Sequence, residues 1–317
     1  MKKYCKKIFI VKNYNLKTLK NIFFEIDPSK RIPFLLGSGF AENHKISEIF
    51  NNRKNYGNDF QVNNLIKSRR FFKKLQENQI LYPKIFTKAP SKKTLIKSFK
   101  SFGSQKIKIL KNKDYNLKKN EYFQEYIDGK NITVQFICCK KKLRLISICK
   151  QVLKKDTFFI DYLITKRITS YQQKKILNLV KKVVKIFNLK GINNIDIISN
   201  KGKIYLIEIN SRPGLSSNII YKLNGGPFIN EKKSCKGFQA TKIIYSKKEI
   251  VINKKIIKFF KENCNSNNFS ELPNERDIIK VNKPICLLHL MANSEKLLEQ
   301  KLNIKAKKFL NKLENNL

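Results

Sequence analysis

The chain has 317 residues, of which 41% are hydrophobic, and its 68 lysine and arginine residues outnumber its 23 aspartate and glutamate residues to give a net charge of +45. That hydrophobic content suffices for one large domain or two to three subdomains with buried cores, which excludes a disordered chain. No apolar run reaches the length of a membrane span, and the run at residues 8–11 is too short for a signal-peptide core. We therefore expect a cytoplasmic protein.

The positive charge leaves two interpretations open. A charge of this size indicates nucleic-acid binding when the basic residues cluster on one face. Here the lysines are spread along the whole chain, together with the abundant asparagine and isoleucine that AT-rich codons give. A small anionic substrate would also be attracted by the field, so nucleic acid is an alternative partner that composition does not exclude. The seven cysteines form no Cys-x-x-Cys pair, which favours reduced thiols in a reducing compartment.

The expected elements of the first half form a series of α/β units. Residues 1–36 hold a short strand and an apolar run, and a Gly-Ser-Gly turn at residues 37–39 opens a helix. Such a turn either holds an anion or simply connects a strand to a helix. A helix is expected over residues 62–79, a strand at 95–97 and a loop at 98–104. Strands then follow at residues 106–110, 121–127, 132–138 and 143–149.

The second half begins with the clearest helical pattern of the chain, at residues 171–188, where apolar side chains recur on one stripe. We expect Gly191 to be the C-cap of this helix. Two strands follow it directly. The C-terminal part is expected to contain a strand (241–245), a helix (250–262), a strand-turn region (278–290) and a terminal helix (294–314). The sequence contains no repeat and no true linker.

Polar residues end the two strands that follow the helix. Residues 191–196 (GINNID) end in Asp196, and residues 205–214 (YLIEINSRPG) carry Glu208, Asn210 and Arg212. Alternation puts Glu208 and Asn210 on one face of a strand, where Asp196 at the end of the neighbouring strand could meet them. Three converging oxygen ligands suit a hard cation such as Mg²⁺, and the arginine could face a phosphate. From spacing alone, two half-buried strands with acidic ends explain the pattern equally well.

The order of these pieces resembles the ATP-grasp superfamily, which includes D-alanine ligases, biotin carboxylases and carbamoyl phosphate synthetases. A lysine in a strand precedes a Gly/Ser loop, and a hinge segment, an amphipathic helix and the Asp…Glu-x-Asn strands come after it. The resemblance covers residues 33–230 and implies an ATP-grasp fold, in which two α+β subdomains clamp ATP. It implies a shortened N-terminal α/β domain (1–66), an ATP-grasp domain (67–230, with a lid subdomain at 67–123 and a metal-site subdomain at 124–230) and a C-terminal extension packing on the core (231–317).

Carried over residue by residue, the resemblance assigns roles to the site. Lys97 would contact the α/β phosphates or adenine N7, with Lys67 the nearest candidate for a further basic contact. Asp196, Glu208 and Asn210 would hold Mg²⁺, with Mn²⁺ as an alternative, and Arg212 would be the catalytic residue that stabilises the transferred phosphate. The remaining nucleotide-binding residues would be Ser101, Gly103 and Ser104 in the phosphate loop, Gln124, Glu125, Tyr126 and Ile127 in the adenine-reading hinge, and Asn131 at the ribose.

A narrower likeness lies outside the nucleotide site. Residues 34–43, 56–58 and 271–286 resemble a group of ATP-dependent carboligases related to the tyramine–glutamate ligase of methanofuran synthesis and to tetrahydromethanopterin-linked one-carbon metabolism. The resemblance implies a carboxylate–amine (C–N) ligase that acts through an acyl phosphate on a small acid and amine, with a place in cofactor biosynthesis. Three departures from the family pattern are Asn131 for glutamate, Asn194 for arginine and few glycines at 101–105. They keep an inactive nucleotide-binding module open beside the nucleic-acid-binding alternative.

Overall fold

The computed structural model describes residues 15–37, 40, 49–50, 53–99, 107–112, 114–139, 142–219, 237–265 and 267–317. The strand expected near the N-terminus, the helix expected after residue 39 and the phosphate-loop residues Ser101, Gly103 and Ser104 lie outside the described residues. Within the described part of the chain, no helix is both long enough and apolar enough to cross a bilayer.

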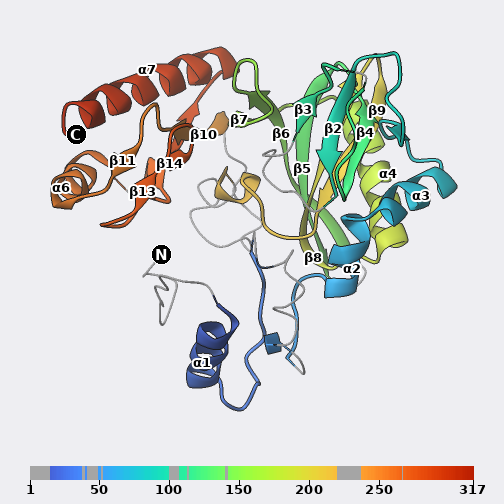
Figure 1. The fold of residues 1–317 in the computed structure, drawn as a ribbon, viewed down its shortest axis with the longest axis horizontal. Coiled ribbons are helices and arrows are strands. Elements are labelled where there is room, and N and C mark those ends of the chain that lie inside the picture. Colours follow the sequence, from blue (N-terminus) through green and yellow to red (C-terminus); the bar gives the residue numbers. More distant parts are fainter. Residues whose placement is uncertain are drawn as a thin grey trace.

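Two antiparallel sheets organise the described residues (Figure 1). The larger sheet has eight strands in the order β12-β14-β10-β7-β6-β5-β8-β9, the smaller sheet has four in the order β1-β4-β2-β3, and β11 pairs with β13. Their bounds are β1 Ile85–Phe86, β2 Thr94–Ser98, β3 Lys108–Ile109, β4 Glu121–Glu125, β5 Lys130–Cys139, β6 Lys142–Leu153, β7 Ile160–Thr165, β8 Gly191–Asn200, β9 Lys203–Asn210, β10 Phe238–Tyr245, β11 Ile250–Val251, β12 Phe269–Ser270, β13 Ile278–Ile279 and β14 Pro284–Ala292. Antiparallel pairing throughout these sheets gives an α+β arrangement, as the resemblance implies.

The described helices are α1 Leu16–Ile26, α2 Phe60–Ile66, α3 Arg69–Glu77, α4 Ser170–Phe187, α6 Lys254–Asn263 and α7 Glu295–Glu314. Helix α4 confirms the helix predicted over residues 171–188 and begins with a capping box in which Thr169 and Gln172 exchange hydrogen bonds. Its apolar stripe, including Val180 and Val183, is buried against Val134 and Phe136 of β5 and Ile195 of β8. Because strand side chains alternate between faces, Asp196 projects from the opposite face of the sheet, away from α4.

The C-terminal elements lie at the other end of the larger sheet from the smaller sheet and α3 (Figure 1). Strands β10 and β14 continue the larger sheet beyond β7, and α6 and α7 pack on them around buried residues such as Ile256, Leu302 and Phe309. Lys150 of β6 ties α7 to the sheet through Glu295 at 2.9 Å and Glu299 at 3.2 Å. Strands β8 and β9 and the C-terminal strands β10 and β14 therefore share one continuous sheet.

Several local predictions are wrong in detail. The helix predicted over 62–79 is two helices, because the chain turns at Lys67 and Ser68, whose hydroxyl donates to the carbonyl of Leu65 at 2.8 Å. The helix predicted over 250–262 begins only at Lys254, after β11 and the N-cap Asn253. Strand β7 was not predicted at all.

Two further corrections concern the strands of the site. The expected C-cap at Gly191 is wrong, since Asn188 caps α4 in a left-handed conformation with φ of 50°. Gly191 instead begins β8 with φ of 64°, and a Cβ there would lie 2.2 Å from the carbonyl oxygen of Tyr56, so the close approach of the two chains requires glycine. Asp196 lies in the middle of β8 and not at its end.

Candidate active site

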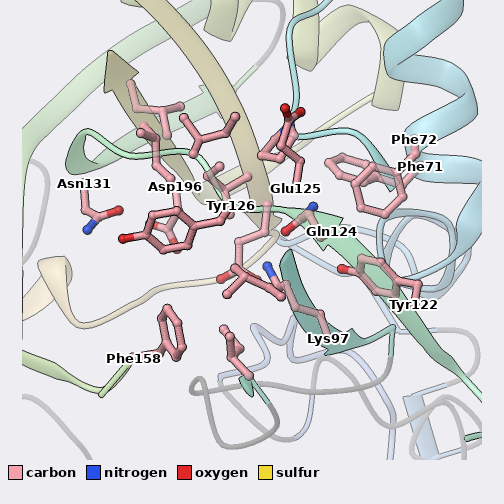
Figure 2. Close-up of a pocket in the computed structure, with 18 of the residues that line it drawn as sticks. Phe71, Phe72, Lys97, Tyr122, Gln124, Glu125, Tyr126, Asn131, Phe158 and Asp196 are labelled. Carbon is pink, nitrogen blue, oxygen red and sulfur yellow. The ribbon is translucent and has the colours of Figure 1, made fainter. Parts of the chain in front are cut away.

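A cavity lies between the smaller sheet and the face of the larger sheet that α4 leaves open (Figure 2). Its lining combines Lys67 from the turn between α2 and α3, Lys97 of β2, Gln151 of β6, and Asp196 and Glu208 of the larger sheet. The sequence-predicted residues that line it are Lys97, Gln124, Glu125, Tyr126, Ile127, Asn131, Asp196 and Glu208. Residues more than 100 positions apart in the sequence thus meet in one cavity.

The acidic wall of this cavity is built on neighbouring strands. Asp196 of β8 pairs directly with Glu208 of β9 in the antiparallel register, so their side chains leave the same face of the sheet. The Asn210 amide Nδ2 donates to Glu208 Oε1 at 2.9 Å and to Asp196 Oδ2 at 3.3 Å. Gln151 lies on β6, two strands away from β8 in the sheet, and its Nε2 donates to Asp196 Oδ1 at 2.9 Å. The structure therefore brings together the three residues that the sequence proposed as metal ligands.

The two carboxyl groups differ in their electrostatics. Burial raises the pKa of Asp196 to about 8, and the negative charge of Glu208 adds to the rise. Burial acts in the same direction on Glu208, but the cations of Lys67 and Lys97 outweigh it and hold the pKa of Glu208 below its usual range. Without a further cation, one of two facing carboxyl groups therefore keeps a proton and the other is ionised.

The chemistry of this donor set fits a hard divalent cation. Asp196 and Glu208 supply carboxylate oxygens. The charge of a bound divalent cation would offset the repulsion between them that adds to the raised pKa of Asp196. The amide of Asn210 now turns its nitrogen toward the acids, and rotation about its last side-chain bond would present the oxygen instead. Among the described residues, no group of three or more His, Cys, Asp or Glu side chains gathers at one place. A metal here would therefore rely on the amide and on a ligand's own oxygens as well as on the two acids.

Two lysines face the acids. Lys67 Nζ lies 3.6 Å from Glu208 Oε2, a position that depends on the turn between α2 and α3. Lys97 is only 7% exposed, and burial lowers its pKa although the charge of Glu208 opposes the shift. A buried ammonium group beside a cavity is costly unless an anion compensates it. The pair of lysines therefore makes this end of the cavity suitable for a polyanion such as a triphosphate.

Beside Lys97, on the neighbouring strand β4, the cavity has the character of a base-binding pocket. Gln124 is 1% exposed and lines the cavity, and among the described residues its Nε2 has no hydrogen-bond partner. Glu125 turns away, since its carboxylate accepts the N–H of Lys84 at 3.1 Å and pairs with Lys92. Figure 2 shows Gln124 and Tyr126 directed into the cavity while the Glu125 carboxylate points outward. The predicted hinge is thus a strand end from which Gln124 and Tyr126 face inward.

Arg212 follows Asn210 in a turn that Asn194 holds. Asn194 Nδ2 donates to the carbonyl of Arg212 at 2.9 Å, and Asn194 Oδ1 accepts from the hydroxyl of Ser216 at 2.7 Å. A Cβ at Gly214 would lie 2.9 Å from Asn194 Nδ2, so the glycine lets the turn fold closely over this amide. The asparagine that departs from the family pattern therefore positions the backbone of the arginine.

Sequence reasoning missed Gln151 and Thr133, which both contact Asp196. Gln151 was missed because β6 continues four residues beyond the predicted strand, to Leu153. Thr133 lies opposite Asp196 on β5, and its hydroxyl lowers the pKa of that acid slightly against the larger effect of burial. Both residues become visible only once the strand pairing is known.

Comparison with known proteins decides the fold family. A sequence profile of the ATP-grasp domain matches residues 67–216. The matched residues are similar to an ATP-grasp domain and make up just under half of the chain. It is also similar in structure to the L-amino acid ligase from Bacillus licheniformis, with a TM-score of 0.65 and 14% identity over 94% of this chain and 82% of that one. The ATP-grasp fold that the resemblance implies is confirmed.

Two curated relatives match part of the chain. The chain is 34% identical to the tyramine–L-glutamate ligase of Methanocaldococcus jannaschii over 151 residues, which are 47% of this chain and 43% of that protein. It is 26% identical to the D-alanine–D-alanine ligase of Petrotoga mobilis over 140 residues, which are 38% of this chain and 47% of that protein. The chain thus spans less than half the length of the curated relatives it matches.

Proposed function

We propose that this protein is an ATP-dependent ligase that joins a carboxylate to an amine and releases ADP and phosphate. The observation that carries the proposal is the opposition of Asp196, Glu208 and Asn210 to Lys67 and Lys97 across one cavity. Both curated relatives of the chain are named as ligases of amino acids, which supports the same reaction class.

ATP would lie along the cavity with its base at Gln124 and its phosphates at the lysines. The inward-facing amide of Gln124 supplies a donor for a base nitrogen or oxygen, and Asn131 of β5 lines the cavity where a ribose would follow. Lys97 and Lys67 then neutralise the phosphate oxygens. Ser101, Gly103 and Ser104 keep their proposed role in covering the phosphates.

Asp196, Glu208 and Asn210 would hold Mg²⁺ at the phosphate end. The metal would supply positive charge against the terminal phosphates of ATP. The protein's own contribution is to orient Asp196 through the amide of Gln151 and to keep Glu208 ionised through the charges of Lys67 and Lys97. Mn²⁺ prefers the same oxygen ligands and is proposed as a substitute.

The reaction proceeds by two displacements. A carboxylate oxygen of the substrate attacks the γ-phosphorus of ATP, a new O–P bond forms, and the bond to ADP breaks. The amine nitrogen then attacks the acyl carbon, the C–N bond forms, phosphate leaves, and the nitrogen gives its proton to water. Arg212 and the lysines stabilise the phosphoryl charge in both steps. Positioning and electrostatics supply the rate, with no enzyme nucleophile.

For the substrate, we propose that the acid is an amino acid or a small peptide-like acid and that the acceptor is a primary amine. The support is the names of the relatives, a tyramine–L-glutamate ligase and a D-alanine–D-alanine ligase. In both names the acceptor carries an amino group and the donor is an amino acid.

An ADP-release screen tests the proposal. The purified protein would be mixed with ATP, Mg²⁺ and pairs drawn from amino acids and small primary amines, including L-glutamate with tyramine. One pair should raise ADP release well above the rate with ATP alone, and Glu208→Gln should abolish the increase. Tight Mg²⁺·ATP binding without stimulation by any pair would identify an inactive nucleotide-binding module instead. Binding to nucleic acid with a steep salt dependence, and none to ATP, would favour the nucleic-acid alternative.

A further inference from the structure

Residues 54–59 connect the chain around Phe34 to the turn at residues 210–212. Phe34 forms a parallel bridge with Asn55, in which its N–H donates to the carbonyl of Lys54 at 2.9 Å and its carbonyl accepts from Tyr56 at 3.0 Å. The next residues lie against the start of β8, where only a glycine at position 191 leaves room for the backbone of Tyr56. Residues 54–59 therefore contact Phe34 on one side and the start of β8 on the other.

Asn58 is the residue through which this segment reaches the site. It is 5% exposed, and its side-chain oxygen accepts the N–H of Lys190 at 2.8 Å. Its amide nitrogen faces three acceptors: Asn193 Oδ1 at 2.8 Å, the carbonyl of Lys190 at 2.9 Å and the carbonyl of Ser211 at 3.1 Å. Both polar atoms of the Asn58 side chain are thus hydrogen-bonded, and their partners lie 132 to 153 residues away in the sequence.

Ser211 is the residue between Asn210 and Arg212. Asn58 holds its carbonyl, and its hydroxyl donates to Asn63 Oδ1, a residue of α2 that is 6% exposed. The following carbonyl, that of Arg212, is held by Asn194. The turn that carries the proposed metal ligand and the proposed catalytic arginine is thus fixed from behind by neutral amides. Neutral amides can do this without adding a charge to the balance between the acids and the lysines.

We infer that Asn58, with Asn63, is a positioning residue that sets the Asn210–Arg212 turn for Mg²⁺ and phosphate, and so couples the N-terminal segment to the site. The inference rests on the proposed function. If Ser211 loses its hold, Asn210 and Arg212 move relative to Asp196 and Glu208, whereas Lys97 and Gln124 stay in place on β2 and β4 of the smaller sheet. The loss should therefore fall on metal-dependent binding and turnover, and not on the nucleotide itself.

The test compares ATP binding with and without Mg²⁺ by calorimetry, because a general loss of structure would weaken both. Asn58→Ala should lower the gain in ATP affinity that Mg²⁺ provides by about 10-fold, the low end for residues that orient metal ligands, with Mg²⁺-free binding within about 2-fold of wild type. Asn63→Ala, which removes the other hold on Ser211, should act in the same direction and serves if Asn58→Ala does not fold.

Two matched controls come from the same region. Asn193→Ala removes one buried partner of Asn58 but leaves the bond to Ser211, and Asn55→Ala disturbs only the local turn in which it bonds Gly57 and Asn58. Both controls should keep the gain in ATP affinity that Mg²⁺ provides. An unchanged gain in Asn58→Ala and Asn63→Ala, or an equal loss with and without Mg²⁺, would overturn the positioning role alone. Absence of any Mg²⁺-dependent ATP binding in the wild-type protein would overturn the proposed function and this inference together.

Discussion

Asp196 and Glu208 face each other across β8 and β9, and a single amide, that of Asn210, donates to both carboxyl groups. Burial dominates at Asp196 and raises its pKa, whereas at Glu208 the charges of Lys67 and Lys97 outweigh burial and lower the pKa. A pair arranged in this way holds an extra proton when no metal compensates it. The site is therefore electrostatically strained in isolation, and that strain can be measured.

Replacing Asp196 with Asn should stabilise the metal-free protein at pH 8. The pKa of Asp196 is about 8 in the folded protein, whereas the ordinary value for aspartate is 3.8. Between pH 3.8 and pH 8, the folded state therefore holds a proton that the unfolded state has lost. The stability that this group contributes is therefore present at low pH and lost as pH rises toward 8. Urea unfolding with EDTA should show an advantage for Asp196→Asn that grows from pH 5 to pH 8. A variant less stable than wild type at pH 8 would contradict the assignment.

Mg²⁺ binding should depend on pH in the opposite sense. The metal binds the ionised pair, so below pH 8 it must displace the proton of Asp196. Affinity should fall by up to about tenfold for each pH unit below 8. Calorimetry at pH 7 in two buffers of different ionisation enthalpy should detect release of close to one proton. The same titration of Asp196→Asn should give weak binding and no proton release, and a wild-type affinity that is flat from pH 6 to 8 would rule the shared proton out.

Lys97→Ala should weaken nucleotide binding by about 1–3 kcal/mol, the range for a hydrogen bond to a charged group. The reason is that Lys97 lines the cavity and is buried beside Glu208. Lys108→Ala is the matched control, because Lys108 lies exposed on β3 of the same sheet and does not line the cavity. Fluorescence titration with an ATP analogue would measure both, and equal affinities for the two variants would exclude a phosphate contact by Lys97.

Local patterns in the sequence predicted the elements better than their connections. The stripe of α4 was found because helical periodicity is a local signal. The break at Lys67 was not, because residues 62–79 keep an apolar pattern through it, and yet the break is what brings Lys67 to Glu208. Strand β7 was missed because its central run is only three buried residues long between polar turns.

The pairing of strands that lie far apart in the sequence could not be predicted, for a different reason. Asp196 appeared to end its strand because an acidic residue interrupts the apolar run there, whereas β8 continues to Asn200 under pairing with β5 and β9. Gln151 and Thr133 reach Asp196 only through that pairing. The family resemblance supplied the convergence of the acids, and spacing alone left it undecided.

Gly191→Ala should destabilise the protein more than Gly202→Ala. Both glycines have positive φ, 64° and 78°, so both variants carry the backbone strain of about 1 kcal/mol or more. Only at position 191 does the new Cβ also meet an atom, the carbonyl oxygen of Tyr56 at 2.2 Å, whereas nothing lies within 4 Å at position 202. Thermal unfolding of the two variants separates the terms, and equal losses would show that Tyr56 does not pack against β8 as described.

Arg212→Ala should leave folding and ATP binding largely intact and reduce product formation by about 10²-fold or more, by analogy with the loss of one donor to an oxyanion. Its backbone is held by Asn194 through a carbonyl, which alanine retains, so the turn should survive the change. The guanidinium would act on charge that develops during phosphoryl transfer, and such an interaction lowers kcat without a matching change in substrate affinity.

Arg212→Lys separates charge from geometry in the same assay. Lysine keeps the positive charge but not the planar, bidentate donor set, so partial recovery of turnover is expected. The measurement is ADP release with the acid–amine pair that stimulates the wild-type protein, alongside calorimetric ATP binding for each variant. Full activity in Arg212→Ala would remove the arginine from catalysis. Loss of the folded state in that variant, with Arg212→Lys folded and fully active, would make its role structural.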